Sequence, residues 1–280
     1  MTNVVAFDNE STWNTNKLTR RFAALGSNAQ SGAYLMFPPE LVILAELWPE
    51  LHGQPILELG VGGGRLVPFL SLLTDRYVAL DWSHPLVVAA KQAHPTSDIR
   101  HGDARNLGAF PDASFKFVLF SYNGTDHIPY EDRGKVLDEV FRVVEPGGYF
   151  AFSTHNLNSL HGELRGVYKR RRLDLSPNLI QTGVRIARWA VGSAQVYAKH
   201  RRLRSAEHSG EGYAIVNDTA AHALLTCYVD PRVQCDALRH SGFVQPSVFG
   251  LDGRPGSVDS DDAWLHFLVK KPAETERASS

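Results

Sequence analysis

Cysteine is scarce in this chain: Cys227 and Cys235 are the only two among 280 residues. Two cysteines cannot build a disulfide framework, and both lack zinc-ligand partners at close spacing. We therefore expect both thiols to be reduced and partly buried, as in a cytoplasmic protein.

Long hydrophobic runs are also missing. No stretch approaches the roughly 18 apolar residues of a membrane span. The polar residues 1–16 have neither the basic segment nor the apolar run of a secretory signal. The net charge is −1, which gives no overall case for nucleic-acid binding. Hydrophobic residues make up 43% of the chain, enough for a sizeable core.

Glycine, by contrast, is concentrated at one place. Segment 56–66 begins as an apolar strand and continues with four glycines between positions 60 and 64. A glycine turn lets the backbone approach a ligand closely, and a helix that begins there points N–H groups at that ligand. Gly60 and Gly62 fit a dinucleotide fingerprint, but Arg65 takes the place of its third glycine, and the Gly-Lys-Ser/Thr of a P-loop is absent.

Strands and helices alternate on both sides of this turn. We predict strands at 55–59, 76–81, 98–101, 114–121, 149–153, 244–251 and 263–269, with a small hairpin at 213–216 and 223–229. We predict helices at 37–48, 65–73, 83–94, 131–144, 179–199 and 230–240. In the first helix Leu41, Leu44, Ala45 and Trp48 are expected to form the apolar face, and Pro49 and Gly53 to end it. The alternation predicts an α/β fold with a Rossmann-like, doubly wound sheet of seven strands, mostly parallel with one antiparallel strand.

Ligands of such sheets bind at the carboxyl ends of the strands. The residues expected there are Glu58, Asp81, Trp82, Asp103, Ala104 and Ser121. An acid some twenty residues past a glycine turn can accept hydrogen bonds from both hydroxyls of a ribose, which is the position of Asp81. Asp103 is placed to accept from an adenine amino group. The order of these residues predicts a single nucleoside site.

Together these segments resemble the successive motifs of the class I S-adenosylmethionine-dependent methyltransferases. The matching segments are 58–64, 81–82, 102–104, 115–121 and 142–148. The last resembles the Arg-Val-Leu-Lys-Pro-Gly-Gly turn of that family, with Val144 and Glu145 as departures. The resemblance spans roughly residues 34 to 156 and resumes from about 230.

The resemblance implies S-adenosylmethionine as the cofactor and S-adenosylhomocysteine as its product. It implies that Glu58 and the turn with Gly60, Gly62 and Gly64 hold the methionine end, and that Asp81 holds the ribose. Trp82 would pack on the adenine, and Asp103 with Ala104 would contact its edge. Ser121 is also expected to be one of the cofactor-binding residues.

Two histidines follow the fourth and fifth strands, His127 and His155. Since histidine titrates near neutral pH, either can take a proton during methyl transfer. We therefore assign a catalytic role to His127, His155 and Asp126. The residues expected to face the substrate are Tyr34, Tyr122, Asn123, Tyr130 and Asn156. A metal held by Asp126 and the two histidines is not favoured, because no short ligand spacing supports it.

Segment 157–229 interrupts the family pattern. Between residues 163 and 204 it holds eleven basic and two acidic residues, so that 18 of 29 basic and 28 of 30 acidic residues lie elsewhere. We interpret it as a helical and hairpin lid. The favoured interpretation of its basic residues is a helix face exposed to solvent. Further hypotheses are recognition of a phosphate or carboxylate on a small substrate, contact with an anionic membrane surface, and, least favoured, nucleic acid.

These features predict five segments: an arm (1–33), a cofactor-binding core (34–156), the lid (157–229), the end of the core (230–271) and a tail (272–280). The predicted function is methyl transfer from S-adenosylmethionine to an oxygen or nitrogen of a small molecule, such as a sugar or a specialised metabolite. Two alternatives stay open. One is a non-catalytic cofactor-binding regulator, and the other is an RNA or protein methyltransferase that uses the basic lid.

Overall fold

The computed structural model describes residues 36–160, 206–218 and 224–274, together with five single positions between 182 and 191. The predicted arm with Tyr34, most of the basic lid and the last residues of the tail lie outside these residues. No helix in the described part of the chain is long and apolar enough to cross a membrane.

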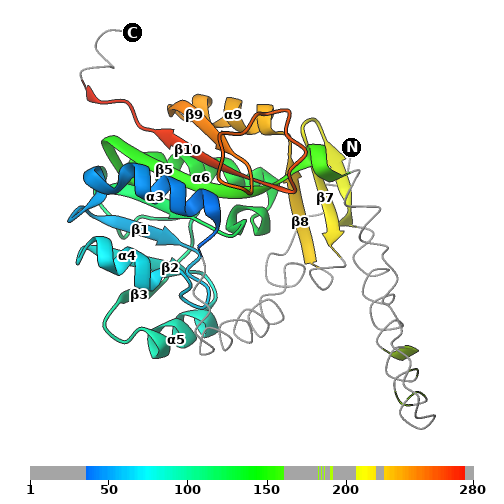
Figure 1. Cartoon of the computed structure of the whole chain (residues 1–280), viewed down its shortest axis with the longest axis horizontal. Coiled ribbons are helices and arrows are strands. Elements are labelled where there is room, and N and C mark those ends of the chain that lie inside the picture. Colours follow the sequence, from blue (N-terminus) through cyan, green and yellow to red (C-terminus); the bar gives the residue numbers. More distant parts are fainter. Residues whose placement is uncertain are drawn as a thin grey trace.

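The core is one twisted sheet with the strand order β3-β2-β1-β4-β5, continued by β10 and β9 (Figure 1). The parallel strands are β1 (Ile56–Leu59), β2 (Tyr77–Asp81), β3 (Asp98–His101), β4 (Phe115–Phe120) and β5 (Val144–Asn156). β10 (Trp264–Lys270) runs antiparallel to both β5 and β9 (Val244–Phe249). The seven-stranded doubly wound sheet with one antiparallel strand is therefore confirmed.

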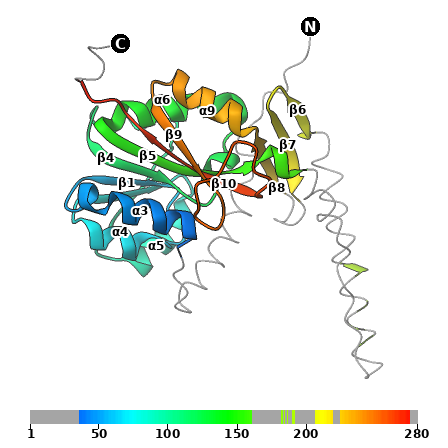
Figure 2. The ribbon, with the colours of Figure 1, turned by 45° about the horizontal axis from the view of Figure 1, so that its top comes forward.

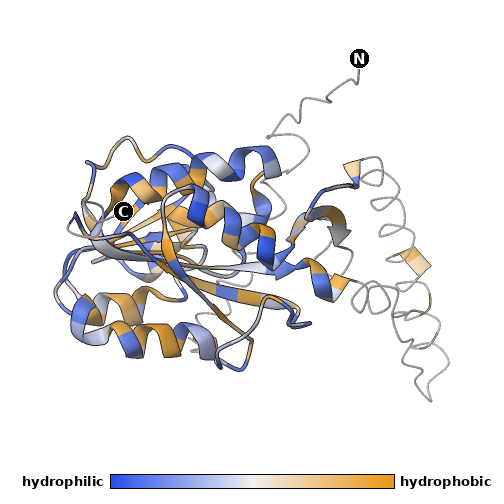
Figure 3. Ribbon diagram, turned by 90° about the horizontal axis from the view of Figure 1, so that it is seen from above, coloured by the Kyte–Doolittle hydropathy of each residue, from blue (hydrophilic) through white to orange (hydrophobic). Residues whose placement is uncertain are grey.

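Helices cover both faces of this sheet (Figure 2). One face packs against α3 (Pro38–Leu51), α4 (Val67–Leu73) and α5 (His84–Ala93). The other face packs against α6 (Arg133–Val143) and α9 (Pro231–His240). Hydrophilic and hydrophobic residues alternate along the helices (Figure 3), as expected for helices with one buried side.

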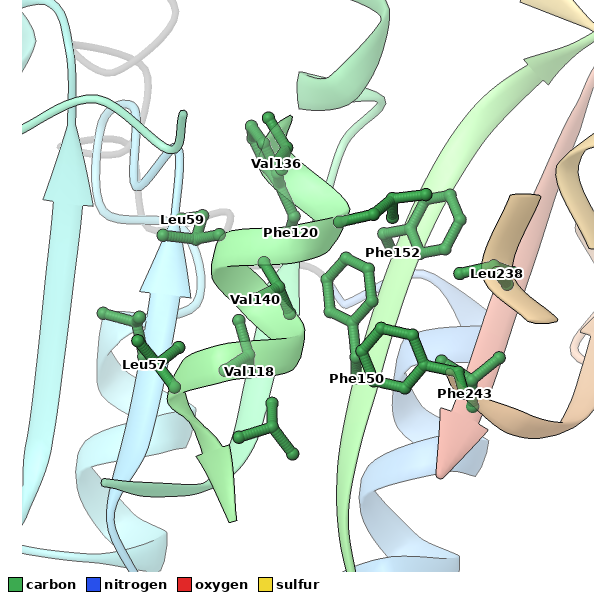
Figure 4. Close-up of a cluster of buried hydrophobic side chains, with 14 of the residues drawn as sticks. Leu57, Leu59, Val118, Phe120, Val136, Val140, Phe150, Phe152, Leu238 and Phe243 are labelled. Carbon is green, nitrogen blue, oxygen red and sulfur yellow. The ribbon is translucent and has the colours of Figure 1, made fainter. Parts of the chain in front are cut away.

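The α6/α9 face holds the larger hydrophobic cluster (Figure 4). Phe150 and Phe152 of β5 stack with ring centroids 4.9 Å apart, and Phe243 lies beside Phe150 at 5.9 Å. Val136 and Val140 of α6 pack against the same cluster. Because side chains alternate along a strand, Leu57 and Leu59 of β1, Val118 and Phe120 of β4 and Phe150 and Phe152 of β5 enter this cluster, and the residues between them face the α3 side.

Strand β5 is much longer than the predicted 149–153: it begins at Val144, which pairs with Phe115 of β4, and at its other end it pairs beyond β4 with a further strand. Its last residues, His155 and Asn156, pair in parallel with Tyr228 and Val229 of β8 (Leu224–Val229). β8 pairs with β7 (Tyr213–Asp218), which confirms the predicted hairpin, and β7 pairs with β6 (His208–Gly210). These three strands bring the sheet to ten strands, more than predicted.

The prediction for α3 is partly wrong. Leu41 and Trp48 are 53% and 46% exposed, and the helix continues past Pro49 but ends at Leu51, before Gly53. The buried stripe is shifted by one position and consists of Pro39, Glu40, Ile43, Leu44, Leu47 and Leu51. At α9, in contrast, Asp230 is the predicted N-cap: its carboxylate accepts from the N–H of Arg232 at 2.7 Å.

Candidate active site

The polar residues at the carboxyl ends of the strands lie on the α3 face of the sheet. In β1 this alternation places Glu58 on that face, between Leu57 and Leu59 on the other. Ser121 follows β4, and Ser153 and His155 are alternate residues of β5, so that these side chains lie on the same face of the sheet as Glu58. The candidate site is therefore built from neighbouring strands on one side of the sheet.

The glycine turn lies between β1 and α4. Gly60, Gly62 and Gly64 all have positive φ, of 69°, 55° and 84°. At Gly60 a Cβ would come within 2.8 Å of the Phe120 ring, so that a larger residue would force the turn away from β4. The helix begins at Val67, two residues later than the predicted Arg65, and has only seven residues. Ligand contacts expected here must therefore come from the turn itself more than from the helix end.

Glu58 is buried beneath this turn, with 2% of its surface exposed. Its Oε2 accepts a hydrogen bond from the Tyr77 hydroxyl of β2. Burial raises the pKa of Glu58 to about 7, although Tyr77 and the charge of Arg65 oppose the shift. The carboxyl group of Glu58 thus changes charge near neutral pH.

Asp81 is also buried, at the end of β2. One carboxylate oxygen accepts from the Gly62 N–H at 2.9 Å, and the other accepts from the Ser83 N–H at 2.8 Å. Burial raises the pKa of Asp81, and these two N–H groups oppose the rise. Next to it, Trp82 is 40% exposed. The structure therefore brings Asp81 against the glycine turn, with an open aromatic side chain beside it.

Asp103 is bound mainly by Arg105. The Arg105 guanidinium donates to both carboxylate oxygens of Asp103 and to Asp132 at 2.7 Å. Burial would raise the pKa of Asp103, but the hydrogen bonds from Arg105 hold it below its ordinary value. The Asp103 side chain keeps 40% exposure, and Ala104 packs partly against the core. Asp103 is therefore a charged carboxylate at the surface of the site.

Arg65 joins the glycine turn to the first turn of α3, a link that the sequence analysis did not predict. Its guanidinium donates to both oxygens of Glu40, at 2.7 and 2.6 Å, and to the Ser121 Oγ at 3.2 Å. Glu40 is 2% exposed and also accepts from the Phe37 N–H at 2.9 Å. Arg65 also lies over the rings of Phe37 and Tyr122. This ion pair explains why Glu40 faces inward.

The loop after β4 contains two consecutive left-handed residues that are not glycine. Tyr122 has φ 54° and Asn123 has φ 55°, a conformation that is uncommon outside glycine and marks a constrained segment. The Asn123 N–H donates to the Ser153 Oγ at 2.8 Å. The Asn123 side chain is 2% exposed, and neither polar atom of its amide has a hydrogen-bond partner. A buried unsatisfied amide at a strand end points to a ligand that completes its bonding.

Asp126 and His155 form a dyad across the ends of β4 and β5. Asp126 is fully buried, and its Oδ2 lies 2.7 Å from Nδ1 of His155 and 2.7 Å from the backbone N of His155. When Nδ1–H donates to a carboxylate, Nε2 carries the lone pair of the ring. The dyad can therefore orient an imidazole and leave Nε2 to accept a proton.

Arg133 supports the dyad from α6 and was not predicted as a site residue. Its guanidinium donates to Asp126 Oδ1 at 3.0 Å and to Gln234 at 3.1 Å. Burial alone would raise the pKa of Asp126, but the hydrogen bond with His155 and the charge of Arg133 hold it below its ordinary value. Asp126 is therefore ionised at neutral pH and fixes the dyad's orientation.

The remaining predicted residues lie around the dyad in different roles. His127 ends the short helix η2 (Gly124–His127), and the hydrogen bonds of Asp126 run to His155, Thr154, Thr125 and Arg133 instead. Tyr130 stacks on Tyr213 of β7 with centroids 3.6 Å apart. Asn156 donates to the carbonyls of Ser260 and Asp262, at 2.7 and 3.0 Å, which is a scaffold contact.

Aromatic rings surround His155 on the α3 face. Trp264 of β10 and Tyr228 of β8 are its direct register neighbours, with ring centroids 5.6 and 4.9 Å from the imidazole. Phe37 and Tyr122 each lie 5.5 Å from the Trp264 ring. We call these five residues the aromatic cluster. Both cysteines, by comparison, are buried free thiols, as predicted.

Comparison with known proteins agrees with this geometry. Residues 57–152 match the methyltransferase domain family. A probable S-adenosylmethionine-dependent methyltransferase of Mycolicibacterium smegmatis is 32% identical over 41% of this chain and 43% of its own length. The malonyl-[acyl-carrier protein] O-methyltransferase of Erwinia billingiae is 31% identical over 50% of this chain and 53% of its own length. The chain thus spans about half the length of these relatives.

Solved structures agree on the fold. The TehB-like S-adenosylmethionine-dependent methyltransferase of Corynebacterium glutamicum superposes with a TM-score of 0.53 at 13% identity, over 91% of this chain and 99% of that one. Identity this low supports the fold alone. The match over 57–152, the relatives and the sheet order agree: this chain carries a methyltransferase domain, similar to those of S-adenosylmethionine-dependent methyltransferases.

Proposed function

We propose that this protein transfers a methyl group from S-adenosylmethionine to a hydroxyl oxygen of a small molecule, with His155 as the general base. The observation that carries the proposal is the 2.7 Å contact between Nδ1 of His155 and the fully buried Asp126. A neutral hydroxyl is a poor nucleophile and needs its proton removed, whereas an amine needs only to be unprotonated. A base held by a buried carboxylate therefore favours oxygen as the acceptor.

The residues at the strand ends fit the cofactor. Asp81 offers a carboxylate at the end of β2, and Trp82 offers a 40% exposed ring beside it. At Gly62 a Cβ would meet only the Gly60 carbonyl oxygen, at 3.9 Å, which leaves open space over the turn. The unsatisfied amide of Asn123 supplies donors and an acceptor at the end of β4. We assign ribose binding to Asp81 and adenine contacts to Trp82, Asp103 and Ala104.

Bound S-adenosylmethionine supplies a methyl group on a positively charged sulfur. In the proposed reaction a lone pair of the acceptor oxygen forms the new O–C bond while the C–S bond breaks, and its electron pair stays on sulfur. The hydroxyl proton passes to Nε2 of His155. Asp126 stabilises the imidazolium that forms, and Arg133 keeps Asp126 ionised.

Calorimetric titration with S-adenosylmethionine and S-adenosylhomocysteine tests the cofactor part. Binding of neither compound would refute the proposal. Radiolabelled methyl transfer to matched alcohols and amines tests the acceptor part, with methylated alcohols as the expected product. Transfer to amines that survives in a His155→Gln variant would contradict the assignment of a base and of oxygen. Cofactor binding without transfer to any member of the panel would favour a cofactor-binding regulator.

A further inference from the structure

The aromatic cluster carries an inference about the methyl acceptor, which rests on the proposed function. Its five members come from five separated parts of the chain: Phe37, Tyr122, His155, Tyr228 and Trp264. Trp264, His155 and Tyr228 form a row across β10, β5 and β8, because direct register neighbours point to the same face of a sheet. The proposed base thus lies between two aromatic side chains.

Phe37 and Tyr122 extend this row towards the glycine turn. Their ring centroids are 5.7 Å apart, and each lies 5.5 Å from Trp264. Tyr122 is 41% exposed, although its backbone is held in the uncommon left-handed conformation. An exposed aromatic ring on a constrained loop, in contact with the Trp264 ring that adjoins His155, is a surface on which another ring can stack.

The charges around the cluster do not favour an ionic acceptor. Among the described residues, the two guanidinium groups that adjoin the site are matched by buried carboxylates, Arg65 by Glu40 and Arg133 by Asp126. His266 contacts Phe37 at 6.3 Å between centroids. Burial and the charge of Arg65 lower the pKa of His266 to about 4, so His266 is uncharged at neutral pH. The described residues around the cluster therefore offer an anionic acceptor no excess of positive charge.

The chemistry of the base points the same way. Proton transfer is most efficient when the acidities of donor and base are close. A phenolic hydroxyl has a pKa of about 10, whereas water, and with it an alkyl hydroxyl, has a pKa of about 16. An imidazole held by a buried carboxylate can deprotonate an aliphatic hydroxyl, but the more acidic phenol gives up its proton more readily to the same base.

We propose that the acceptor is an uncharged aromatic hydroxyl compound, whose ring stacks within the aromatic cluster and whose hydroxyl meets Nε2 of His155. The anionic acceptor considered for the basic lid is a separate hypothesis, because most of the lid lies outside the described residues. The transfer step is the one given above, with the phenolic oxygen as nucleophile and its proton going to His155.

The test uses the full chain saturated with S-adenosylhomocysteine and three probes of similar size: 2-naphthol, decahydro-2-naphthol and 2-naphthoate. We expect calorimetry to show that 2-naphthol binds at least tenfold more tightly than either of the other two probes. We also expect labelled methyl transfer from S-adenosylmethionine to 2-naphthol. Equal affinity for the saturated alcohol, or preference for the carboxylate, would overturn the proposal. Since the cofactor is titrated first, failure of the proposed function is detected separately, as absence of S-adenosylhomocysteine binding.

Two variants locate the binding surface. Tyr122→Asn removes the exposed ring and keeps a residue that tolerates the left-handed backbone, and Trp264→Leu removes the central ring. Each is expected to weaken 2-naphthol binding about two- to tenfold without changing the affinity for S-adenosylhomocysteine. Trp48→Leu, on the exposed side of α3, is the matched control. If both cluster variants bind 2-naphthol as tightly as the control does, the aromatic cluster is not the acceptor site.

Discussion

The carboxylate of Glu40 and the guanidinium of Arg65 meet in a two-point hydrogen bond, at 2.7 and 2.6 Å, and tie the first turn of α3 to the glycine turn. Glu40 is 2% exposed, so its charge is taken out of water and compensated almost entirely by Arg65. Arg65 stands where a dinucleotide fingerprint has its third glycine. In this chain that position holds the helix over the site instead.

Removing Arg65 is therefore expected to destabilise the protein strongly. In Arg65→Met the buried Glu40 loses its counter-charge, which costs about 3–5 kcal/mol of unfolding free energy. The matched control is Arg100→Met, because Arg100 binds both oxygens of Asp98 while the two side chains are 48% and 46% exposed. Exposed pairs contribute less than about 1 kcal/mol. Equal losses of unfolding free energy in the two variants, measured by urea denaturation, would show that the buried Glu40–Arg65 pair stabilises the protein no more than an exposed pair does.

Glu58 makes the stability of the protein depend on pH. Its pKa is about 7 in the folded chain against 4.5 for the ordinary side chain. Between these values the folded state binds the additional proton, so the free energy of unfolding falls as pH rises from 4.5 to 7. The fall attributable to Glu58 is at most about 3 kcal/mol.

The Glu58→Gln variant is expected to lose this part of the slope, as measured by urea denaturation at pH 5 and pH 7.5. Glu139→Gln is the control, since the hydrogen bond from Arg142 lowers the pKa of Glu139. The contribution of Glu139 is lost at more acidic pH, so its variant keeps the wild-type slope in this window. A Glu58→Gln slope equal to that of the wild type would contradict the assignment.

His155→Gln is expected to lower kcat by a factor of about 10² to 10⁴, the usual contribution of a general base. Affinity for S-adenosylhomocysteine should remain within experimental error, because His155 acts on the acceptor. Asp126→Asn should lower kcat comparably and also destabilise the fold, since Arg133 is left without its buried partner. His240→Gln, on the exposed end of α9, provides the control for a histidine change away from the site. Retained turnover in His155→Gln would contradict the assignment of His155 as the general base.

Asp81→Ala is expected to weaken binding of S-adenosylhomocysteine by about 1–3 kcal/mol through loss of charged hydrogen bonds. Calorimetry measures the change directly. Asp98→Ala removes an acid of the neighbouring strand that is bound to Arg100 at the surface, and it should bind the cofactor normally. If the two variants behave alike, the ribose is held by another residue.

The parts of the fold that depend on local pattern could be predicted from the sequence. Alternating apolar strands and amphipathic helices fixed the sheet class, and the strand ends located Glu58, Asp81 and Asp103. Asp126 and His155 were both named from their places after β4 and β5. Their pairing was not predicted, because the two residues are 29 positions apart and no local spacing reports the contact.

The errors have long-range causes. The face of α3 was assigned from Leu41, Leu44 and Trp48, but the contact with Arg65 turns Glu40 inward and moves the buried stripe to Ile43, Leu44 and Leu47. The carboxyl end of β5 was underestimated, because its last residues pair with β8, more than seventy positions later. Its amino end was missed because Val144 pairs with Phe115 of β4 before the Pro-Gly-Gly turn. Arg133 was missed for the same reason: its role depends on contacts with Asp126 and Gln234, which lie in other elements.

The pairing of Asn156 with Val229 has a consequence for how acceptor choice can change. The chain leaves the core after Asn156 and returns at Val229, and neighbouring strands lie only about 5 Å apart. A segment whose two ends nearly touch can be exchanged for another without moving either junction. The described ends of segment 157–228 thus lie side by side, and its last residue, Tyr228, belongs to the aromatic cluster. Chimaeras that exchange this segment between relatives would test whether it decides acceptor choice.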